Sequence, residues 1–426
     1  MSLPLFLPCA AGVEALLADE VRRVLPNAVV HEARGGVALD GEPHEVMVLN
    51  LESRLAQRVL IEVAHGPYAH EHDLYELAHG VAWDQWITPQ HTLRVDTTAK
   101  ASPLKSLNFA GLRVKDAVCD QLRETQGERP SVDTQRPDLP IVLHAGATDA
   151  TLYVDSSGES LFKRGWRADK GDAPLKETLA AAMLAAAGWR GTPGAGGALH
   201  DPCCGSGTIA IEAAQIACGI APGLKRRFAF ERLLPFADAA MRAELQRLRS
   251  NAQSRIHASA VPIHASDLSF RMVDFARRNA QRAGVEAAIT FNGGDALERP
   301  APALPGNMPG TLMVNPPYGE RIEVGGKARS NRSVRPEPVE GSARTELAPQ
   351  RTAPDDFFAR LATHWKRAYT QHPAGWTAYV LSPDMKLPSA MRLKESRRVP
   401  MWNGPIECRL FRFDLVAGSA RAKPSA

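Results

Sequence analysis

The chain has 426 residues, of which 44% are hydrophobic and 23% charged, and its formal net charge is +4. This length suits two or three domains, and the composition is that of a globular protein rather than a disordered one. No apolar run approaches the ~20 residues that a membrane-spanning helix needs, so we expect no membrane partner. The six cysteines are scattered and show no CxxC pair or Cys/His ligand spacing, which predicts free thiols, no bound metal and a cytoplasmic location.

Charge is unevenly distributed along the chain. Acidic residues outnumber basic ones in residues 1–160, whereas basic residues outnumber acidic ones in the remainder. A basic C-terminal part is compatible with a polyanionic partner such as a nucleic acid. The apolar N-terminal stretch lacks the basic residues of a signal peptide and continues into an amphipathic helix pattern, so we interpret it as mature protein.

Short strands alternate with helices in the first third of the chain, which predicts an α+β module. Residues 29–39 form an expected hairpin that turns at Gly35 and Gly36. Hydrophobic periodicity predicts the other elements. The expected helices are 44–57, 73–86 and 109–124, and the expected strands are 58–64, 92–98, 139–145 and 150–155.

From about residue 165 the pattern becomes a regular alternation of strands and helices, which predicts a parallel, doubly wound sheet. Pro174 is expected to open an Ala-rich helix, and a helical insert is expected at 235–257. A terminal hairpin is expected to turn at Asn403 and Gly404. The expected strands are a short one ending at Asp201 and then 261–267, 287–295, 310–316 and 376–383, with helices at 208–218, 269–283 and 355–370. Residues 327–352 are rich in Pro, Arg, Ser and Glu and are expected to be a disordered insertion.

The sequence DPCCGSGT, at 201–208, lies between a strand and a helix and predicts a cofactor loop. Glycines there let the backbone approach a ligand closely, and the following helix N-terminus offers free N–H groups. The expected cofactor-binding residues are Asp201, Cys203, Gly205, Ser206, Gly207 and Thr208. The spacing also fits the dinucleotide pattern GxGxxA, but the acidic residue that a dehydrogenase needs about 20 positions further on, at the end of the next strand, does not occur there.

Two further acidic residues end the next strands. Asp267 closes strand 261–267 and could accept hydrogen bonds from ribose hydroxyls, and Asp295 could accept one from an adenine amine. Either residue alone could equally be a turn or capping aspartate. Three acids at three successive strand ends favour a nucleoside site.

The tetrapeptide Asn315, Pro316, Pro317, Tyr318 follows an apolar strand and supplies what methyl transfer to an exocyclic base amine requires. Two prolines keep the backbone extended and stiff. The Asn side chain and a Pro carbonyl can each accept one amine hydrogen, which directs the nitrogen lone pair towards a methyl donor, while Tyr318 can stack on the base. We expect these four residues to be catalytic, with Asn315 also near the cofactor.

Other polar clusters are less specific. His70, Glu71, His72 and Asp73 are interpreted as a solvated helix start rather than a metal site. The cations that precede the cofactor loop could contact RNA, the methionine carboxylate or surface acids; they are Arg164, Arg167 and Lys176.

With these motifs in place, the chain resembles the THUMP-containing class I RNA methyltransferases, and especially the 23S rRNA guanine-N2 methyltransferase L family. The resemblance covers nearly the whole chain and includes DLYELA, GLRVKDAVCDQLRE, FKRGWR, DPCCGSGTIAIEAA and NPPYGERI. It implies a ferredoxin-like lobe at 1–44, a THUMP RNA-binding domain at 45–160 and a Rossmann-like methyltransferase domain at 161–416, followed by a disordered tail at 417–426. Members often form the N-terminal half of a bifunctional K/L enzyme, and we expect the second module to be absent here.

The resemblance implies S-adenosylmethionine as cofactor and 23S rRNA, free or in a preribosomal particle, as partner. The expected reaction is methylation of a guanine N2. Methylation of tRNA guanine N2 or of adenine N6 remains an alternative, because the tetrapeptide suits any exocyclic amine. A non-catalytic rRNA-binding assembly factor is a third hypothesis.

Overall fold

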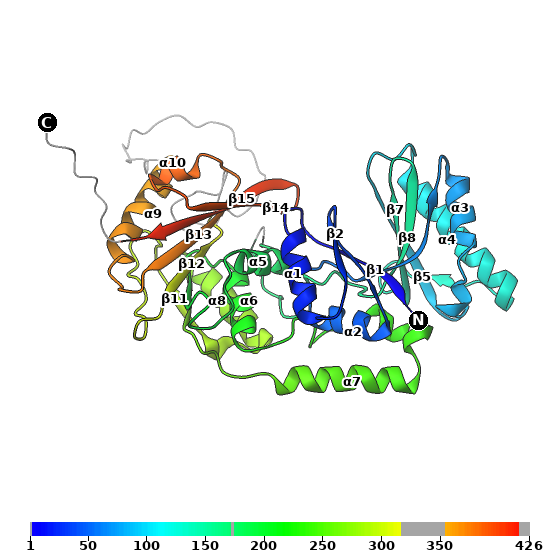
Figure 1. The fold of residues 1–426 in the computed structure, drawn as a ribbon, viewed down its shortest axis with the longest axis horizontal. Helices are drawn as coiled ribbons and strands as arrows, with labels where there is room; N and C mark the ends of the chain where they lie inside the picture. Colours follow the sequence, from blue (N-terminus) through cyan, green and yellow to red (C-terminus); the bar gives the residue numbers. More distant parts are fainter. Residues whose placement is uncertain (1, 172–173, 317–353, 417–426) are drawn as a thin grey trace, which may run out of the picture.

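The computed structural model describes residues 2–171, 174–316 and 354–416. The described residues form two β-sheets, of eight and seven strands, with helices packed against them. The molecule is elongated, with the sheet built from the first third of the chain beside the sheet built from the rest (Figure 1). The expected insertion at 327–352 and tail at 417–426 lie outside the described residues.

The N-terminal half of the first sheet has the order β-α-β-β-α-β. Its elements are β1 (Leu3–Pro8), α1 (Glu14–Val24), β2 (Val30–Ala33), β3 (Gly36–Gly41), α2 (Pro43–Glu52) and β4 (Leu60–Pro67). The strand order β2-β3-β1-β4 is antiparallel throughout, and the β2–β3 pair is the hairpin expected around Gly35 and Gly36. This arrangement confirms a ferredoxin-like fold. The second helix stops earlier than the expected 44–57.

The other half of the first sheet continues the first without a break, because β4 pairs with both β1 and β8. Its elements are α3 (Glu71–His79), β5 (Thr92–Ala99), α4 (Leu107–Gln126), β6 (Ser131–Val132), β7 (Leu139–Ala145) and β8 (Asp149–Asp155). The complete order is β2-β3-β1-β4-β8-β7-β5-β6. The two expected N-terminal units therefore share one eight-stranded sheet rather than forming separate ones.

The expected helix at 73–86 is wrong in its second half. Helix α3 ends at His79, Gly80 caps it, and Trp83–Gln85 form a separate 3-10 turn. The physical reason is burial: Trp83 is fully buried, and its indole Nε1 donates to the carbonyl of Ala78 at 2.7 Å. A continuous helix would not bring the indole back to that carbonyl.

The second sheet has the strand order β11-β10-β9-β12-β13-β15-β14. Its strands are β9 (Ala198–Asp201), β10 (Ile263–Asp267), β11 (Ile289–Gly293), β12 (Gly310–Val314), β13 (Trp376–Ser382), β14 (Arg397–Asn403) and β15 (Ile406–Leu415). The first five are parallel, whereas β15 is antiparallel to both β13 and β14. This confirms the doubly wound sheet and the terminal hairpin. The inserted antiparallel strand distinguishes it from an all-parallel dinucleotide-binding sheet.

Helices cover the second sheet and bury its apolar faces. The described helices in this part of the chain are α5 (Glu177–Ala186), α6 (Thr208–Ala217), α8 (Phe270–Ala283), α9 (Pro354–Ala368) and α10 (Leu387–Met391), together with α7 (Ala239–Ser254), which packs on the N-terminal lobe instead; 3-10 turns lie at Ala229–Arg232, Leu234–Phe236 and Glu286–Ala288. Helix α5 begins at Glu177 rather than at the expected Pro174. No helix in the described part of the chain is long and apolar enough to cross a membrane.

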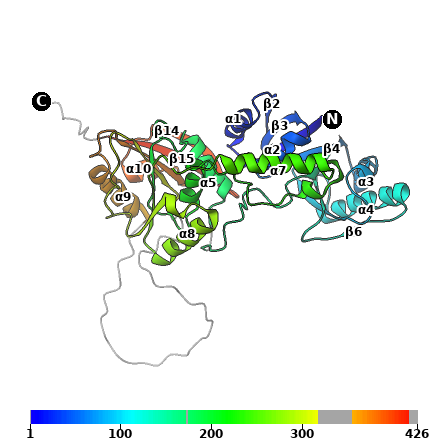
Figure 2. The same cartoon turned by 90° about the horizontal axis from the view of Figure 1, so that it is seen from below.

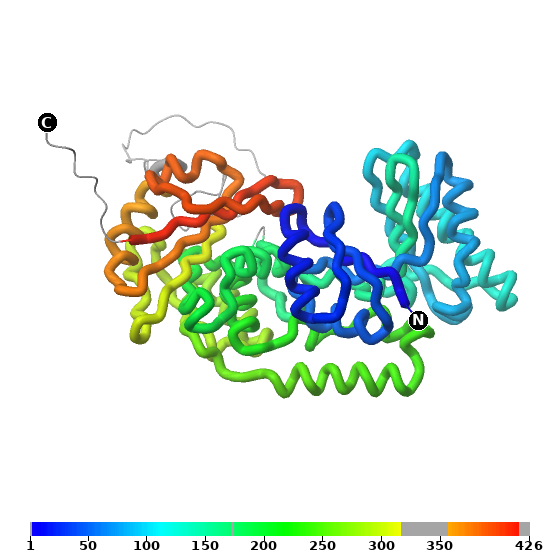
Figure 3. Tube along the Cα trace, viewed as in Figure 1, coloured from blue at the N-terminus to red at the C-terminus, as the bar shows by residue number. Residues whose placement is uncertain are grey.

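The two sheets are joined by an extensive intramolecular interface. Helix α7 packs against α2 of the N-terminal lobe and runs from there along the molecule towards the second sheet (Figures 2 and 3). There His44 Nδ1 lies 2.8 Å from a carboxylate oxygen of Glu244. At the opposite end of the lobe, Gly12 contacts Pro400 of β14 so closely that a Cβ at Gly12 would lie 2.3 Å from the Pro400 oxygen. The N-terminal module is thus fixed to the second sheet at both ends.

Candidate active site at the carboxyl edge of the second sheet

Four of the expected site residues lie at the carboxyl ends of adjacent parallel strands. Asp201 and Asp267 end β9 and β10, Asp295 follows β11 by two residues, and Asn315 follows β12 by one. Strand β9 lies between β10 and β12. The strand order reverses direction between β9 and β12, and this switch point is where open α/β sheets bind ligands.

The loop from β9 to α6 has two glycines with different tasks. Gly205 has φ +53°, and a Cβ there would meet no atom within 4 Å. Gly207 has φ +89°, and its Cβ would lie 2.9 Å from the Cβ of Ala276 on α8. Gly205 thus leaves open space beside the backbone, where a ligand can approach, whereas Gly207 allows α6 to pack closely on α8.

The three aspartates hold the turns at the strand ends. Each accepts a hydrogen bond from the N–H two residues further on, at 3.3 Å for Asp201 and 2.9 Å for Asp267 and Asp295. Asp267 also accepts from Gly205 N–H at 2.9 Å, which ties the glycine loop to β10. All three aspartates therefore stabilise the turn that follows their strand, and Asp267 also holds the glycine loop between β9 and α6 in place.

The electrostatics of these strand ends favour a cationic ligand. Burial raises the pKa of Asp201 well above its ordinary value, and the neighbouring Asp267 raises it further. Burial likewise raises the pKa of Asp267. No ion pair with Lys or Arg compensates any of the three aspartates within the described ranges. A positively charged group placed among them would stabilise their ionised forms.

The adjacent thiols are unsuited to covalent catalysis. Burial, together with the aspartates nearby, raises the pKa of Cys203 and Cys204 well above the ordinary thiol value. Because the thiolate is the nucleophilic form, both side chains stay neutral near pH 7. Cys203 can therefore line the site only as a small apolar group.

Asn315 has an unsatisfied buried oxygen at the edge of the site. Its Oδ1 is buried and accepts no hydrogen bond from the described residues. An orphaned acceptor of this kind costs free energy unless a ligand donates to it. Pro316 is buried beside it, whereas Pro317 and Tyr318 lie outside the described residues.

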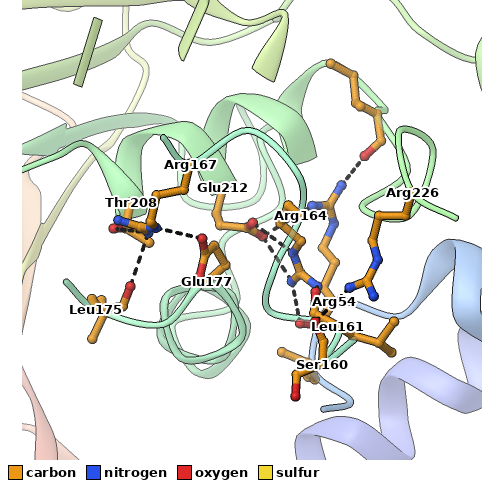
Figure 4. Close-up of polar contacts among 12 residues, drawn as sticks. Arg54, Ser160, Leu161, Arg164, Arg167, Leu175, Glu177, Thr208, Glu212 and Arg226 are labelled. Atoms are coloured by element: carbon orange, nitrogen blue, oxygen red, sulfur yellow. Dashed lines mark hydrogen bonds and ion pairs between the residues drawn. The ribbon is translucent and has the colours of Figure 1, made fainter. Parts of the chain in front are cut away.

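Arg167 braces the cofactor loop from behind rather than facing RNA or a ligand (Figure 4). Its guanidinium donates to Ser206 Oγ at 2.9 Å and to Thr208 Oγ1 at 2.8 Å, while Nε donates to Glu177 at 2.8 Å. The Glu177 side chain is only 3% exposed. Arg167 thus fixes the side chains on both sides of Gly207, and the acid that it pairs with is the buried Glu177 rather than a surface acid.

Arg164 belongs to a second buried ion cluster, which joins the two modules (Figure 4). Its Nε donates to Glu212 of α6 at 3.1 Å, and its terminal nitrogen donates to the Arg54 carbonyl at 2.7 Å. Arg54, from the N-terminal module, lies 3.4 Å from the same Glu212 carboxylate. Since Glu212 is fully buried, this cluster is structural and Arg164 has no access to RNA. Lys176 instead lies over the ring of Phe162.

The sequence motifs missed several residues that complete the site. Leu268 and Phe270 are 51% and 78% exposed directly after Asp267, and Phe270 covers Gly293 at the end of β11. The signal in the sequence was the pair of apolar residues, Leu268 and Phe270, that closely follows the strand-end acid. Asn279 of α8 donates to the Ser206 carbonyl at 3.0 Å, and no sequence pattern marks it.

The His70 to Asp73 cluster behaves as a helix start. Asp73 accepts from the N–H groups of Ala69 and His70 at 2.7 and 3.1 Å, as a capping residue does. No group of three or more potential ligand side chains in the described part of the chain could hold a metal ion.

Family models match three consecutive parts of the chain. Residues 4–60 match an RlmL ferredoxin-like domain, residues 68–155 a THUMP domain and residues 164–332 an RMKL-like methyltransferase domain. These matches follow the division between the two halves of the first sheet and the second sheet.

Curated relatives share the same arrangement. Ribosomal RNA large subunit methyltransferase K/L from Syntrophotalea carbinolica is 36% identical over 412 residues, which cover 96% of this chain and 53% of that protein. The protein of the same name from Pseudomonas aeruginosa is 34% identical and covers 95% of this chain and 52% of its own length. The chain thus spans about half the length of the curated relatives it matches.

Solved structures agree with this arrangement. A methyltransferase crystallised with S-adenosylhomocysteine, SMU.472, has a TM-score of 0.79 and 25% identity and covers 99% of both chains. A protein from Listeria monocytogenes, described as an N6-adenine-specific DNA methylase, has a TM-score of 0.78 and 25% identity and covers 97% of this chain and 96% of its own. The chain therefore carries an RlmL ferredoxin-like, a THUMP and an RMKL-like methyltransferase domain in this order, and nearly its whole length is similar to about half of the K/L methyltransferases.

Proposed function

We propose that this protein transfers a methyl group from S-adenosylmethionine to the exocyclic N2 of a guanine in 23S rRNA. The observation that carries the proposal is the convergence of Asp201, Asp267, Asp295 and Asn315 at one sheet edge, beside the open glycine loop. The rRNA methyltransferase K/L relatives support the RNA substrate. The structural relative solved with S-adenosylhomocysteine supports the cofactor.

The residues present fit this cofactor. S-adenosylmethionine supplies an electrophilic methyl carbon on a positively charged sulfonium, and the uncompensated aspartates favour such a cation. In this proposal Asp267 would accept hydrogen bonds from ribose hydroxyls, and Asp295 would accept one from the adenine amine. The backbone of Cys203, Gly205, Ser206, Gly207 and Thr208 would bound the methionine part, on the side where Gly205 leaves space.

Asn315 and the proline corner would hold the reacting base. The buried Asn315 Oδ1, which has no hydrogen-bond donor among the described residues, would accept one hydrogen of the base amine. The Pro316 carbonyl would accept the other. Held in this way, the amine nitrogen would direct its lone pair at the methyl group that the cofactor supplies when bound, and the proton lost on methylation would pass to water. For Pro317 and Tyr318, which lie outside the described residues, the roles expected from the sequence are kept as part of the proposal: a stiff corner and a stacking face for the base. Catalysis rests on positioning and electrostatics, with no strong base.

Replacing Asn315 tests this assignment. Asn315→Ala should lower methyl transfer from labelled cofactor to a 23S rRNA transcript on the order of 10²–10³-fold, because one amine hydrogen loses its acceptor. Cofactor affinity, measured by calorimetry with S-adenosylhomocysteine, should change little. Asn307→Ala, at an exposed turn of the segment leading into β12, is the matched control and should keep full activity. Full turnover in the Asn315 variant would remove Asn315 from the mechanism.

Adenine N6 is the second candidate target, favoured by the name of the Listeria relative. Mass spectrometry of nucleosides from methylated RNA separates N2-methylguanosine from N6-methyladenosine. Parallel reactions with 23S rRNA and tRNA identify the RNA. Rescue of a strain lacking the protein by the Asn315→Ala variant would instead favour a non-catalytic assembly role.

The remaining parts of the proposal concern place and organisation. We propose action in the cytoplasm on rRNA or a preribosomal particle, and the six free cysteines suit a reducing compartment. We also propose that the methyltransferase domain spans 161–416; the ferredoxin-like lobe runs past the expected limit of residue 44, because α2 and β4 complete its β-α-β-β-α-β order.

A further inference from the structure

A deep groove lies at the junction between the THUMP half of the first sheet and the second module. Its volume is about 760 Å³. Among the described residues that line it, eight are Arg or Lys and one, Glu159, is a carboxylate. A cleft lined by one sign of charge focuses the electrostatic field and attracts the opposite charge.

The groove exists only because distant segments meet. The THUMP half contributes Arg94 of β5 and Arg136, which precedes β7. Arg58, which precedes β4, and Lys163, which follows β8, line it as well. The first third of the chain is acidic overall, yet the part of it that faces this groove is basic.

The segment after α6 supplies the remaining cations. Lys225, Arg226, Arg227 and Arg232 fall within eight consecutive positions, and Arg227 has a side chain that is 86% exposed. Arg226 is held in place by the carbonyls of Ser160 and Glu159, at 2.8 and 2.5 Å, and its side chain approaches the segment at Ser160 in Figure 4.

The charge of the groove is only partly neutralised. Arg58, Arg94, Lys163, Arg227 and Arg232 each form an ion pair with a nearby carboxylate. Arg136, Lys225 and Arg226 form none with any residue that the structure describes. Three full positive charges are therefore left uncompensated, and burial of Arg226 lowers its pKa only to about 10, so it stays charged at pH 7.

One edge of the groove is connected to the cofactor loop through α8. Lys225 Nζ donates to the Arg282 carbonyl at 2.7 Å, and the Arg282 guanidinium donates to Asn279 Oδ1 at 2.5 Å. Asn279 in turn holds the Ser206 carbonyl of the loop at 3.0 Å. A polyanion in the groove would thus lie one helix away from the loop that carries the cofactor.

We propose that this groove binds the sugar-phosphate backbone of the substrate RNA and sets how the RNA is presented to the active site. The inference rests on the proposed function, because it names where that substrate is held. A succession of exposed cations across two modules suits a repeating chain of phosphates better than one small anion. Contacts to phosphate position a nucleic acid without reading its sequence.

Two substitutions test the groove without touching the catalytic edge. Arg136→Gln with Arg227→Gln removes two exposed cations of the groove and leaves the Lys225–Arg282 contact in place. Arg22→Gln with Arg247→Gln is the control, since it removes the same charge from α1 and α7, outside the groove. Filter binding of full-length 23S rRNA transcript at several salt concentrations gives the affinity and its salt dependence.

The groove variant should bind the transcript on the order of tenfold more weakly, with a salt slope smaller by about two, one for each phosphate that the variant no longer neutralises. The control should keep the wild-type slope. S-adenosylhomocysteine affinity should be unchanged in both variants, which shows that the fold is intact. Equal affinity and slope in the two variants would overturn the groove as the RNA site and leave an acidic protein as its occupant.

The outcome also separates this inference from the proposed function. If both variants bind alike while the protein still methylates 23S rRNA, the groove fails and the function stands. If the groove variant loses binding but the wild-type protein methylates no RNA, the binding site stands and the methylation proposal fails.

Discussion

Asp267 illustrates how one side chain carries both structure and ligand recognition. Its two carboxylate oxygens accept from Ser269 and Gly205, so it holds the glycine loop against β10. Burial raises its pKa, which means that the free protein ionises this group only at a higher pH than an exposed aspartate. A ligand whose hydroxyls donate to the carboxylate prefers the ionised form.

Cofactor affinity should therefore depend on pH. As the pH falls through the raised pKa of Asp267, the carboxylate gains a proton, loses acceptor capacity, and the affinity for S-adenosylhomocysteine should decrease. Calorimetric titrations from about neutral pH into the acidic range measure this. Asp267→Asn should bind more weakly at neutral pH and show a shallower pH profile; the wild-type profile in that variant would assign the titration to another group.

At the scale of the element, the two glycines of the β9–α6 loop separate stability from binding. Both have positive φ, but only Gly207 is closely packed, since a Cβ added there would lie 2.9 Å from the Cβ of Ala276. A side chain at Gly205 would enter the open space instead.

Gly207→Ala should destabilise the protein by about 1–3 kcal/mol, because α6 must move away from α8. Gly205→Ala should cost only about 1 kcal/mol for the backbone conformation but should weaken cofactor binding more strongly. Gly127→Ala is the control: φ is +87°, no atom lies within 4 Å, and the residue caps α4 far from the site. Denaturant unfolding and cofactor titration of the three variants measure both effects; equal binding in all three would contradict a ligand beside Gly205.

At the scale of the whole molecule, the modules are held together by a buried ion cluster and by surface contacts. Glu212, on α6 of the methyltransferase module, is fully buried. Its carboxylate forms ion pairs with Arg54 of the N-terminal module and with Arg164 of its own module. Glu244 joins the modules through His44, but its side chain is 23% exposed. Water therefore weakens the attraction between His44 and Glu244, whereas the ion pairs of the buried Glu212 are shielded from water.

Glu212→Gln should reduce the free energy of unfolding by about 3–5 kcal/mol, because two buried guanidinium groups lose their shared carboxylate. Glu244→Gln should cost less than about 1 kcal/mol. Urea unfolding of both variants checks the difference. Similar losses would show that the buried cluster does not hold the modules together.

The sequence by itself determined the features that depend on local order. Alternating strands and helices predicted the parallel sheet. Asp201 and Asp267 marked strand ends, because the apolar residues of a buried strand give way to polar ones where the strand reaches the edge of the sheet. The place of Asn315 beside the glycine loop followed from the parallel topology alone. The motifs at 201–208 and 315–318 also indicated the family.

Only the tertiary structure decided which distant charges meet. It buried Arg164 and Arg167 as internal braces, although their sequence context suited a surface, and it broke the helix expected at 73–86 to bury Trp83. It also joined the two N-terminal units into one sheet and brought Arg94, Arg136 and Lys225 to one groove. Local sequence constrains backbone periodicity over a few residues, whereas burial and long-range electrostatics depend on segments that the chain brings together only when it folds.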